Sequence, residues 1–116
     1  MAEPTLTPAV QQQLAQLQQQ NQALQATAQQ RAQFEAMKAE GEQALAALES
    51  IADDAPVYRS VGAFLVKETG KQSAVDRLKE DQETLEIRIA RLQKQETSLK
   101  ESLTALQQKL QGALKG

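Results

Sequence analysis

The side chains that most often perform catalysis or bind metals are missing from this 116-residue sequence, which contains neither histidine nor cysteine. Without histidine there is no ready general base near neutral pH, and without cysteine there is no thiolate nucleophile, disulfide or thiolate metal site. We therefore expect no enzyme activity, no cofactor and no metal site. What remains is non-covalent association between helices or subunits. It would use a few charged residues that interrupt rows of apolar residues, and one central apolar run.

Charges of both signs are interspersed along the chain, and the formal net charge is only −2. Such a chain has no basic stripe to neutralise phosphates, so we expect no nucleic-acid partner. The N-terminus lacks the basic and apolar regions of a secretion signal, and the longest apolar run, residues 61–66, is far shorter than the roughly 20 residues that cross a bilayer. A membrane-surface helix would need a basic face and aromatic anchors, which are also missing. We expect a cytoplasmic protein without a membrane partner.

Composition and periodicity predict two long helices. Aromatic residues make up 3% of the chain, and Ala, Gln, Leu, Glu and Lys dominate, as in coiled coils. Thr7 followed by Pro8 is typical of a helix start, so the first helix should cover residues 8–51, and the second, capped near Thr69 or Ser73, residues 73–114. The second helix carries a seven-residue apolar repeat, formed by Val75, Leu78, Leu85, Ile89, Leu92, Leu99, Leu103, Leu106 and Leu110.

A strict seven-residue repeat favours another helix as the partner, and folding the chain at its midpoint sets the two apolar rows antiparallel. Arg31 then lies opposite Glu96. We predict that they form an ion pair that fixes the register, the alternative being that both charges turn out to solvent. Gly41 falls opposite Leu85, where it either makes room for that side chain or weakens the seam, the interface between the two apolar rows.

The end of the coil near both chain termini should form an exposed apolar tip. By the same pairing rule, Val10 would face a position beyond residue 116, so its layer lacks a partner. Exposed apolar patches commonly mark binding surfaces. The residues expected to form this binding surface are Leu6, Val10, Leu14, Leu106, Leu110 and Leu114.

Between the helices, residues 57–67 contain two strand-like segments separated by a turn, which predicts a β-hairpin. An isolated two-stranded hairpin is marginally stable and leaves two unpaired edges, which pairing between several subunits into a closed barrel would remove. The alternative is a connection packed against its own coil. The residues expected to form the assembly surface are Val57, Tyr58, Val61, Gly62, Phe64, Leu65 and Val66.

The segment DDAPVYRSVGAFLVK, the glutamine-rich first helix and the pattern LEIRIARLQKQETSLKESL together resemble the beta-type subunits of prefoldin, a chaperone family of archaea and eukaryotes. The resemblance spans nearly the whole chain and implies a single prefoldin-like domain over residues 1–116. The expected fold is α-dominated: two long helices form an antiparallel coiled coil, joined by a central β-hairpin that assembles into an intersubunit β-barrel. Ala63 followed by Phe64 departs from the family pattern and leaves the turn type open.

The resemblance also implies partners and a function. The partners are a prefoldin alpha subunit and further beta subunits in a hexamer of two alpha and four beta, unfolded client proteins, and a group II chaperonin. The function is ATP-independent capture of unfolded polypeptide at the coiled-coil tips and its delivery to the chaperonin. The repeats alone allow an alternative, a structural coiled-coil scaffold or tethering subunit without chaperone activity.

Overall fold

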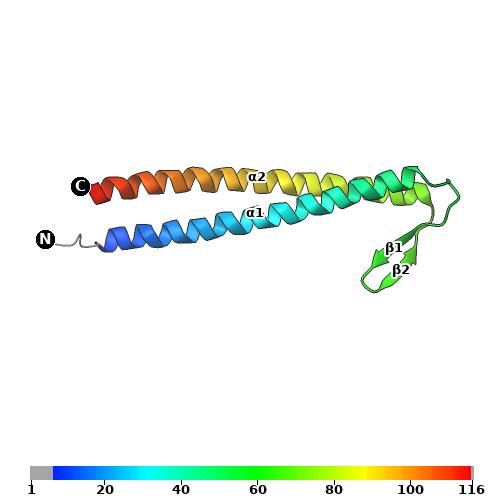
Figure 1. The fold of residues 1–116 in the computed structure, drawn as a ribbon, viewed down its shortest axis with the longest axis horizontal. Helices are drawn as coiled ribbons and strands as arrows, with labels where there is room; N and C mark the ends of the chain where they lie inside the picture. The colour runs from blue at the N-terminus through cyan, green and yellow to red at the C-terminus, as the bar shows by residue number, and fades with distance from the viewer. Residues whose placement is uncertain (1–6, 116) are drawn as a thin grey trace. The chain divides into compact units, whose positions relative to one another are not determined.

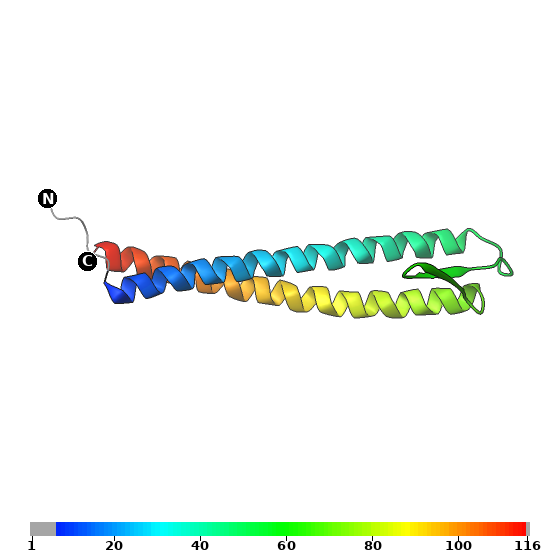
Figure 2. The same cartoon turned by 90° about the horizontal axis from the view of Figure 1, so that it is seen from below.

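The computed structural model describes residues 7–115. Its elements follow one another as helix α1 (Pro8–Glu49), strand β1 (Tyr58–Val61), strand β2 (Phe64–Lys67) and helix α2 (Lys71–Lys115). The chain divides into two compact units, here called the terminal unit, residues 7–31 and 90–115, and the hairpin unit, residues 32–89. In each unit a segment of α1 lies alongside a segment of α2 that runs in the opposite direction (Figures 1 and 2). The expected pair of antiparallel helices joined by a central hairpin is confirmed.

Helix α1 begins where Thr7 provides a cap. The Thr7 Oγ1 accepts a hydrogen bond from the Val10 N–H at 3.1 Å, and the Thr7 carbonyl accepts the first helical bond, from Gln11, at 3.0 Å. Pro8 loses nothing in the first turn because an N–H at that position has no helical partner. No helix within residues 7–115 has an apolar stretch long enough to span a membrane.

The inner ends of both helices differ by two residues from the expected bounds. Helix α1 ends at Glu49 rather than at residue 51, because the last turn tightens: the Ser50 N–H and Oγ both donate to the Ala47 carbonyl, at 3.2 and 2.8 Å. Helix α2 begins at Lys71 rather than at residue 73, because the Gly70 carbonyl already accepts the Ala74 N–H at 3.2 Å. Differences of this size are common at helix ends.

Most buried residues of α2 lie on the predicted seven-residue repeat, and they include Gln82 and Glu96, the two polar residues that interrupt it. Ala74 is buried outside the repeat, whereas Val75, Leu78 and Leu99 of the repeat are half-buried. Helix α1 shows the same three-and-four spacing, but within Pro8–Glu49 only Val10 is buried and the other residues of the row are half-buried. The row of α1 contains long polar side chains such as Gln20, Arg31 and Lys38, which remain half-buried beside polar groups of α2. The buried residues of α2 are Ala74, Gln82, Leu85 and Ile89 in the hairpin unit, and Leu92, Glu96, Leu103, Leu106 and Leu110 in the terminal unit.

The hairpin is a two-stranded antiparallel sheet closed by a tight turn (Figure 1). Val61 pairs with Phe64, so the loop consists of Gly62 and Ala63 alone. Gly62 has a φ of 58°, whereas Ala63 does not have a positive φ. A positive φ at only the first loop residue is the signature of a type II′ turn, which matches the right-handed twist of the strands. The turn type is therefore set by the glycine.

Replacing Gly62 with alanine should loosen the hairpin, because a side chain at positive φ costs about 1–2 kcal/mol. We expect the amide hydrogens paired between β1 and β2 to exchange roughly 5–30 times faster in Gly62→Ala than in the parent chain. Gly112→Ala is the matched control, since Gly112 lies in α2 with open space around it and alanine should stabilise that helix. Unchanged exchange in Gly62→Ala would show that the turn does not need glycine.

Candidate functional site

The hairpin presents large apolar side chains to water. All residues of both strands are exposed, and among their large apolar side chains the most exposed are Phe64 at 74% and Leu65 at 73%. Neighbouring residues of a strand point to opposite faces. One face of the hairpin therefore carries Tyr58 and Leu65, and the other carries Val61, Phe64 and Val66. Both faces carry uncovered apolar side chains, alongside Ser60 and Lys67 on the first and Arg59 on the second, and such exposure is unusual for a sheet that functions alone.

The two edges of the hairpin also carry backbone groups without backbone partners. Glu68 donates its N–H to the Val57 carbonyl at 2.8 Å, just beyond the strands, and the tight turn closes the other end. Bonded and non-bonded pairs alternate along an antiparallel ladder. The N–H and C=O groups of Tyr58 and Ser60 therefore face outward on one edge, and those of Leu65 and Lys67 on the other. Within residues 7–115 no backbone hydrogen bond reaches these outward groups, so the hairpin is a template for further strands.

In the terminal unit, Arg31 and Glu96 form the ion pair expected from their positions. The Arg31 Nε donates to the Glu96 Oε1 at 2.7 Å, and the side chains are 28% and 9% exposed. Glu96 occupies a buried position of the repeat, where a carboxylate without a cation or hydrogen-bond donors would be destabilising. The geometry is compatible with a role in fixing the register of the two helices, and that role stays a prediction.

In the hairpin unit, the seam contains a polar contact that differs from the expected pairing of Gly41 with Leu85. The three heavy atoms nearest to a Cβ built on Gly41 all belong to Gln82, with its Cδ at 2.9 Å. The Gln82 Nε2 donates to the Lys38 carbonyl at 2.9 Å, which is possible because Gly41 leaves the helix surface open. Gly41 thus makes room for a side chain, but the side chain is Gln82. In the sequence, this contact is marked only by Gln82, a polar residue that interrupts the apolar repeat between Leu78 and Leu85.

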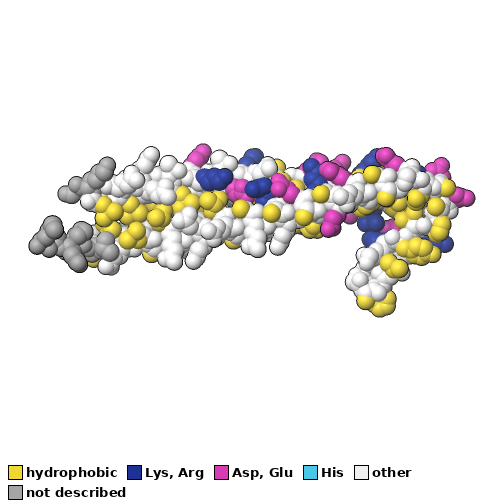
Figure 3. Space-filling view, viewed as in Figure 1, with side chains coloured by type: hydrophobic (Ala, Val, Ile, Leu, Met, Phe, Trp, Pro, Cys, Tyr) yellow, Lys and Arg dark blue, Asp and Glu magenta, His cyan; other side chains and the backbone are white. Residues whose placement is uncertain are grey.

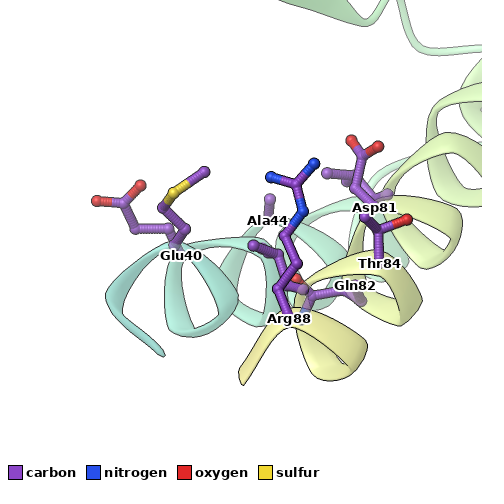
Figure 4. Close-up of a pocket in the computed structure, with 10 residues that line it drawn as sticks. Glu40, Ala44, Asp81, Gln82, Thr84 and Arg88 are labelled. Carbon is purple, nitrogen blue, oxygen red and sulfur yellow. The ribbon is translucent and has the colours of Figure 1, made fainter. Parts of the chain in front are cut away.

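A cleft of about 510 Å³ opens over this contact, because Gly41 and Ala44 leave little side chain on α1. In the view of Figure 4, Arg88 extends from α2 with Glu40 on one side and Asp81 on the other. The Arg88 guanidinium lies 5.7 Å from the centroid of the Phe34 ring, within the range of a cation–π contact. The cleft is lined by Met37, Glu40, Gly41, Ala44, Leu78, Asp81, Gln82, Thr84, Leu85 and Arg88.

The tip of the terminal unit, residues 7–14 and 106–114, is less exposed than expected. Val10, Leu106 and Leu110 are buried, whereas Leu14 and Leu114 are exposed; the sixth residue of the predicted set, Leu6, lies outside the described residues. Figure 3 shows hydrophobic side chains gathered between the two helices at this end.

The burial of Val10 contradicts the expectation that this residue would lie exposed in a layer without a partner. Further along the same unit, the Ser102 Oγ donates to the Gln20 Oε1 at 3.0 Å, so side chains of the two helices also meet there. The tip layer is closed in this structure, and three of the predicted client-binding residues belong to the seam.

Three comparisons with known proteins match the same family along almost the whole chain. The family model described as "Prefoldin subunit" matches residues 11–116. The prefoldin subunit beta of Archaeoglobus fulgidus is 50% identical over 109 residues, which cover 94% of this chain and 93% of that protein. The corresponding protein of Methanosarcina acetivorans is 46% identical over 109 residues, covering 94% and 92%. The crystal structure of the prefoldin beta subunit from Thermococcus strain KS-1 matches with a TM-score of 0.85 at 41% identity, covering 98% of this chain and 99% of that one.

The Arg31–Glu96 pair should show strong coupling in a double-mutant cycle. Arg31→Met leaves the nearly buried Glu96 carboxylate without this cation, and we expect a loss of about 2 kcal/mol in the free energy of unfolding. The loss is smaller than for a fully buried pair because Arg31 is partly exposed. Arg31→Met combined with Glu96→Leu should recover most of that loss. Thermal unfolding of the four chains gives the coupling energy.

The pair of Lys38 and Glu86 is the control for this cycle. Its atoms lie 3.5 Å apart, and its side chains are 33% and 58% exposed. We expect its coupling to stay below about 0.5 kcal/mol. If the coupling between Arg31 and Glu96 is no larger, the proposed role of that pair in the register is refuted.

Proposed function

The chain belongs to the prefoldin family of chaperone subunits, and on this premise we propose that it is a beta-type subunit that assembles through its hairpin and holds unfolded protein at its coil tip. Prefoldin is a chaperone family rather than an enzyme family, and prefoldin beta subunits form complexes with other prefoldin subunits. The complex proposed for this chain is a cytoplasmic hexamer of two alpha and four beta subunits. It binds clients without ATP and delivers them to a group II chaperonin.

The observation that carries this proposal is the uncovered hairpin. Its strands expose apolar side chains on both faces and unpaired backbone groups on both edges. Strands from neighbouring subunits would satisfy the edges, and closure of the sheet into a barrel would bury one face. Helix α2, in contrast, already buries most of its apolar row within the chain. Assembly through the hairpin therefore leaves the coils free to act.

Replacing Leu65 with lysine should dissociate the complex and leave the helices intact. Leu65 is 73% exposed in the chain alone, so a lysine costs nothing there, but in a barrel it would place a charge against apolar neighbours. Val66→Lys tests the opposite face of the hairpin in the same way. Sedimentation measures assembly and circular dichroism measures helix content. A Leu65→Lys and a Val66→Lys chain that both sediment as the parent complex would contradict assembly through the hairpin.

Client binding requires the tip to open in part, because Val10, Leu106 and Leu110 are buried in the closed state. End layers of a coil open at lower free energy than its centre. The Gln13 Oε1, also near this end, has no hydrogen-bond partner among the described residues.

Leu14 and Leu114 are exposed already and can make the first contact with an apolar client segment. Each leucine that a client buries contributes about 1.5–3 kcal/mol, so one tip holds weakly and several tips hold together.

Removing the exposed leucines of the tip should weaken client holding without affecting assembly. We expect the double variant Leu14→Gln, Leu114→Gln to suppress aggregation of a denatured test protein at least threefold less well than the parent complex, because several weak contacts act together. Light scattering measures the aggregation. Ile87→Gln is the matched control, since Ile87 is 55% exposed but belongs to the hairpin unit.

The outcomes of this assay separate the proposed function from the alternative. Loss of holding in the double variant but not in the control supports capture at the tip. Undiminished holding by the double variant would place client binding elsewhere. A parent complex that suppresses no aggregation would favour a structural tethering subunit over a chaperone.

A further inference from the structure

The hairpin has little apolar contact to hold it at a defined angle to the helices. All residues of β1 and β2 are exposed. A hollow of about 440 Å³ lies between β1 and the inner ends of the helices, lined among others by Leu48, Ile51 and Leu78. Figure 1 shows the hairpin projecting sideways from the point where α1 ends and α2 begins. Since burial does not fix its direction, polar contacts must do so.

One carboxylate links the hairpin to α2. The Arg77 Nε, from the second turn of α2, donates to the Glu68 Oε1 at 2.9 Å, and the Arg59 Nε, from β1, lies 4.0 Å from the same oxygen. The Glu68 side chain is only 13% exposed, and the Glu68 N–H also donates to the Val57 carbonyl at 2.8 Å. Arg77 is held in turn by Asp81, one helical turn further on, at 3.6 Å. Figure 3 shows basic and acidic side chains gathered where the hairpin leaves the helices.

We propose that Glu68 is a positioning residue that fixes the angle of the hairpin relative to α2, and so presents the strand edges in the direction that assembly requires. The claim about assembly rests on the proposed function; the claim about the angle does not. Glu68 stands between two guanidinium groups, one on the strand and one on the helix, so its charge draws both elements together. Without that charge, Arg59 and Arg77 repel each other across the same gap and the hairpin swings on residues 68–70.

Other parts of the hairpin unit support this assignment by contrast. Lys71 donates to the Ile51 carbonyl at 3.0 Å and lies 3.5 Å from Asp53, contacts that join the ends of the two helices but do not reach the strands. Among the ion pairs of the described residues, those of Glu68 are the ones that connect a strand to a helix.

The angle is measured directly in the isolated full-length chain. Because the sequence contains no cysteine, spin labels can be attached at Ala63→Cys in the turn and Lys79→Cys on the exposed side of α2, both within the hairpin unit. Pulsed electron spin resonance then gives the distribution of distances between the labels. We expect a narrow distribution in the parent background and one at least twice as wide with Glu68→Gln, which keeps the shape of the side chain but removes its charge.

Two further chains show whether Glu68 acts through Arg77. Arg77→Gln should widen the distribution as Glu68→Gln does, and the double variant should be no wider than either single variant, because both remove the same contact. Glu83→Gln is the matched control, since Glu83 is exposed on α2 and makes no ion pair among the described residues; it should leave the distribution narrow. Helix content measured by circular dichroism should stay unchanged in all of them.

Assembly of unlabelled chains is the second readout. We expect Glu68→Gln to raise the dissociation constant toward the other prefoldin subunits about tenfold, the size of one charge-assisted hydrogen bond reduced by solvent screening, and Glu83→Gln to leave it unchanged.

Each failure has a separate meaning. A distance distribution that stays narrow in Glu68→Gln overturns the proposal that Glu68 fixes the angle of the hairpin. A wider distribution with unchanged affinity overturns the link between hairpin angle and assembly, and leaves the proposed function intact. If the parent chain binds no other prefoldin subunit, the proposed function fails, while the distance distributions still decide whether Glu68 sets the angle.

Discussion

A two-stranded hairpin cannot pair its own outer edges, and this constraint governs how the rest of the chain is used. Tyr58 and Ser60 on one edge, and Leu65 and Lys67 on the other, direct backbone groups outward where nothing in the described chain accepts or donates. Water satisfies these groups in the isolated chain, but the exposed apolar side chains on both faces favour a partner over water. The hairpin is therefore the part of the molecule that needs other subunits, whereas helix α2 already buries most of its apolar row within the chain.

Polar residues fix the geometry that apolar burial leaves undefined. A repeated leucine row packs almost equally well after a shift of one heptad, so we expect contacts such as Arg31 with Glu96 and Gln82 with the Lys38 carbonyl to distinguish one register from the next. We propose the corresponding role for Glu68 at the joint, where a hairpin with little apolar contact to the coil would otherwise take many directions. In each case the expected effect is to select one arrangement rather than to add much stability.

Much of the fold followed from residue spacing, because helices and strands have different periods. The repeat from Val75 to Leu110 predicted α2 and its buried stripe, and the position of Arg31 on the facing row predicted its contact with Glu96. The burial of Val10 did not follow, because a rule that pairs residues by number does not say how far the side chains at the end of a coil cover one another. The role of Glu68 left no signal in the sequence, since a glutamate after a strand is usually a solvated residue. It becomes visible only when the turn at Gly62 brings β1 and β2 together beside α2.

The chain combines two helices that pack against each other with a hairpin whose edges are incomplete alone. The most direct test is amide hydrogen exchange at Tyr58, Ser60, Leu65 and Lys67, whose N–H groups form the free edges, in the isolated chain and in the complex reconstituted with other prefoldin subunits. The account predicts fast exchange at these four residues in the isolated chain and at least about a hundredfold slower exchange in the complex. Equally fast exchange at all four in both samples, or slow exchange already in the isolated chain, would contradict it.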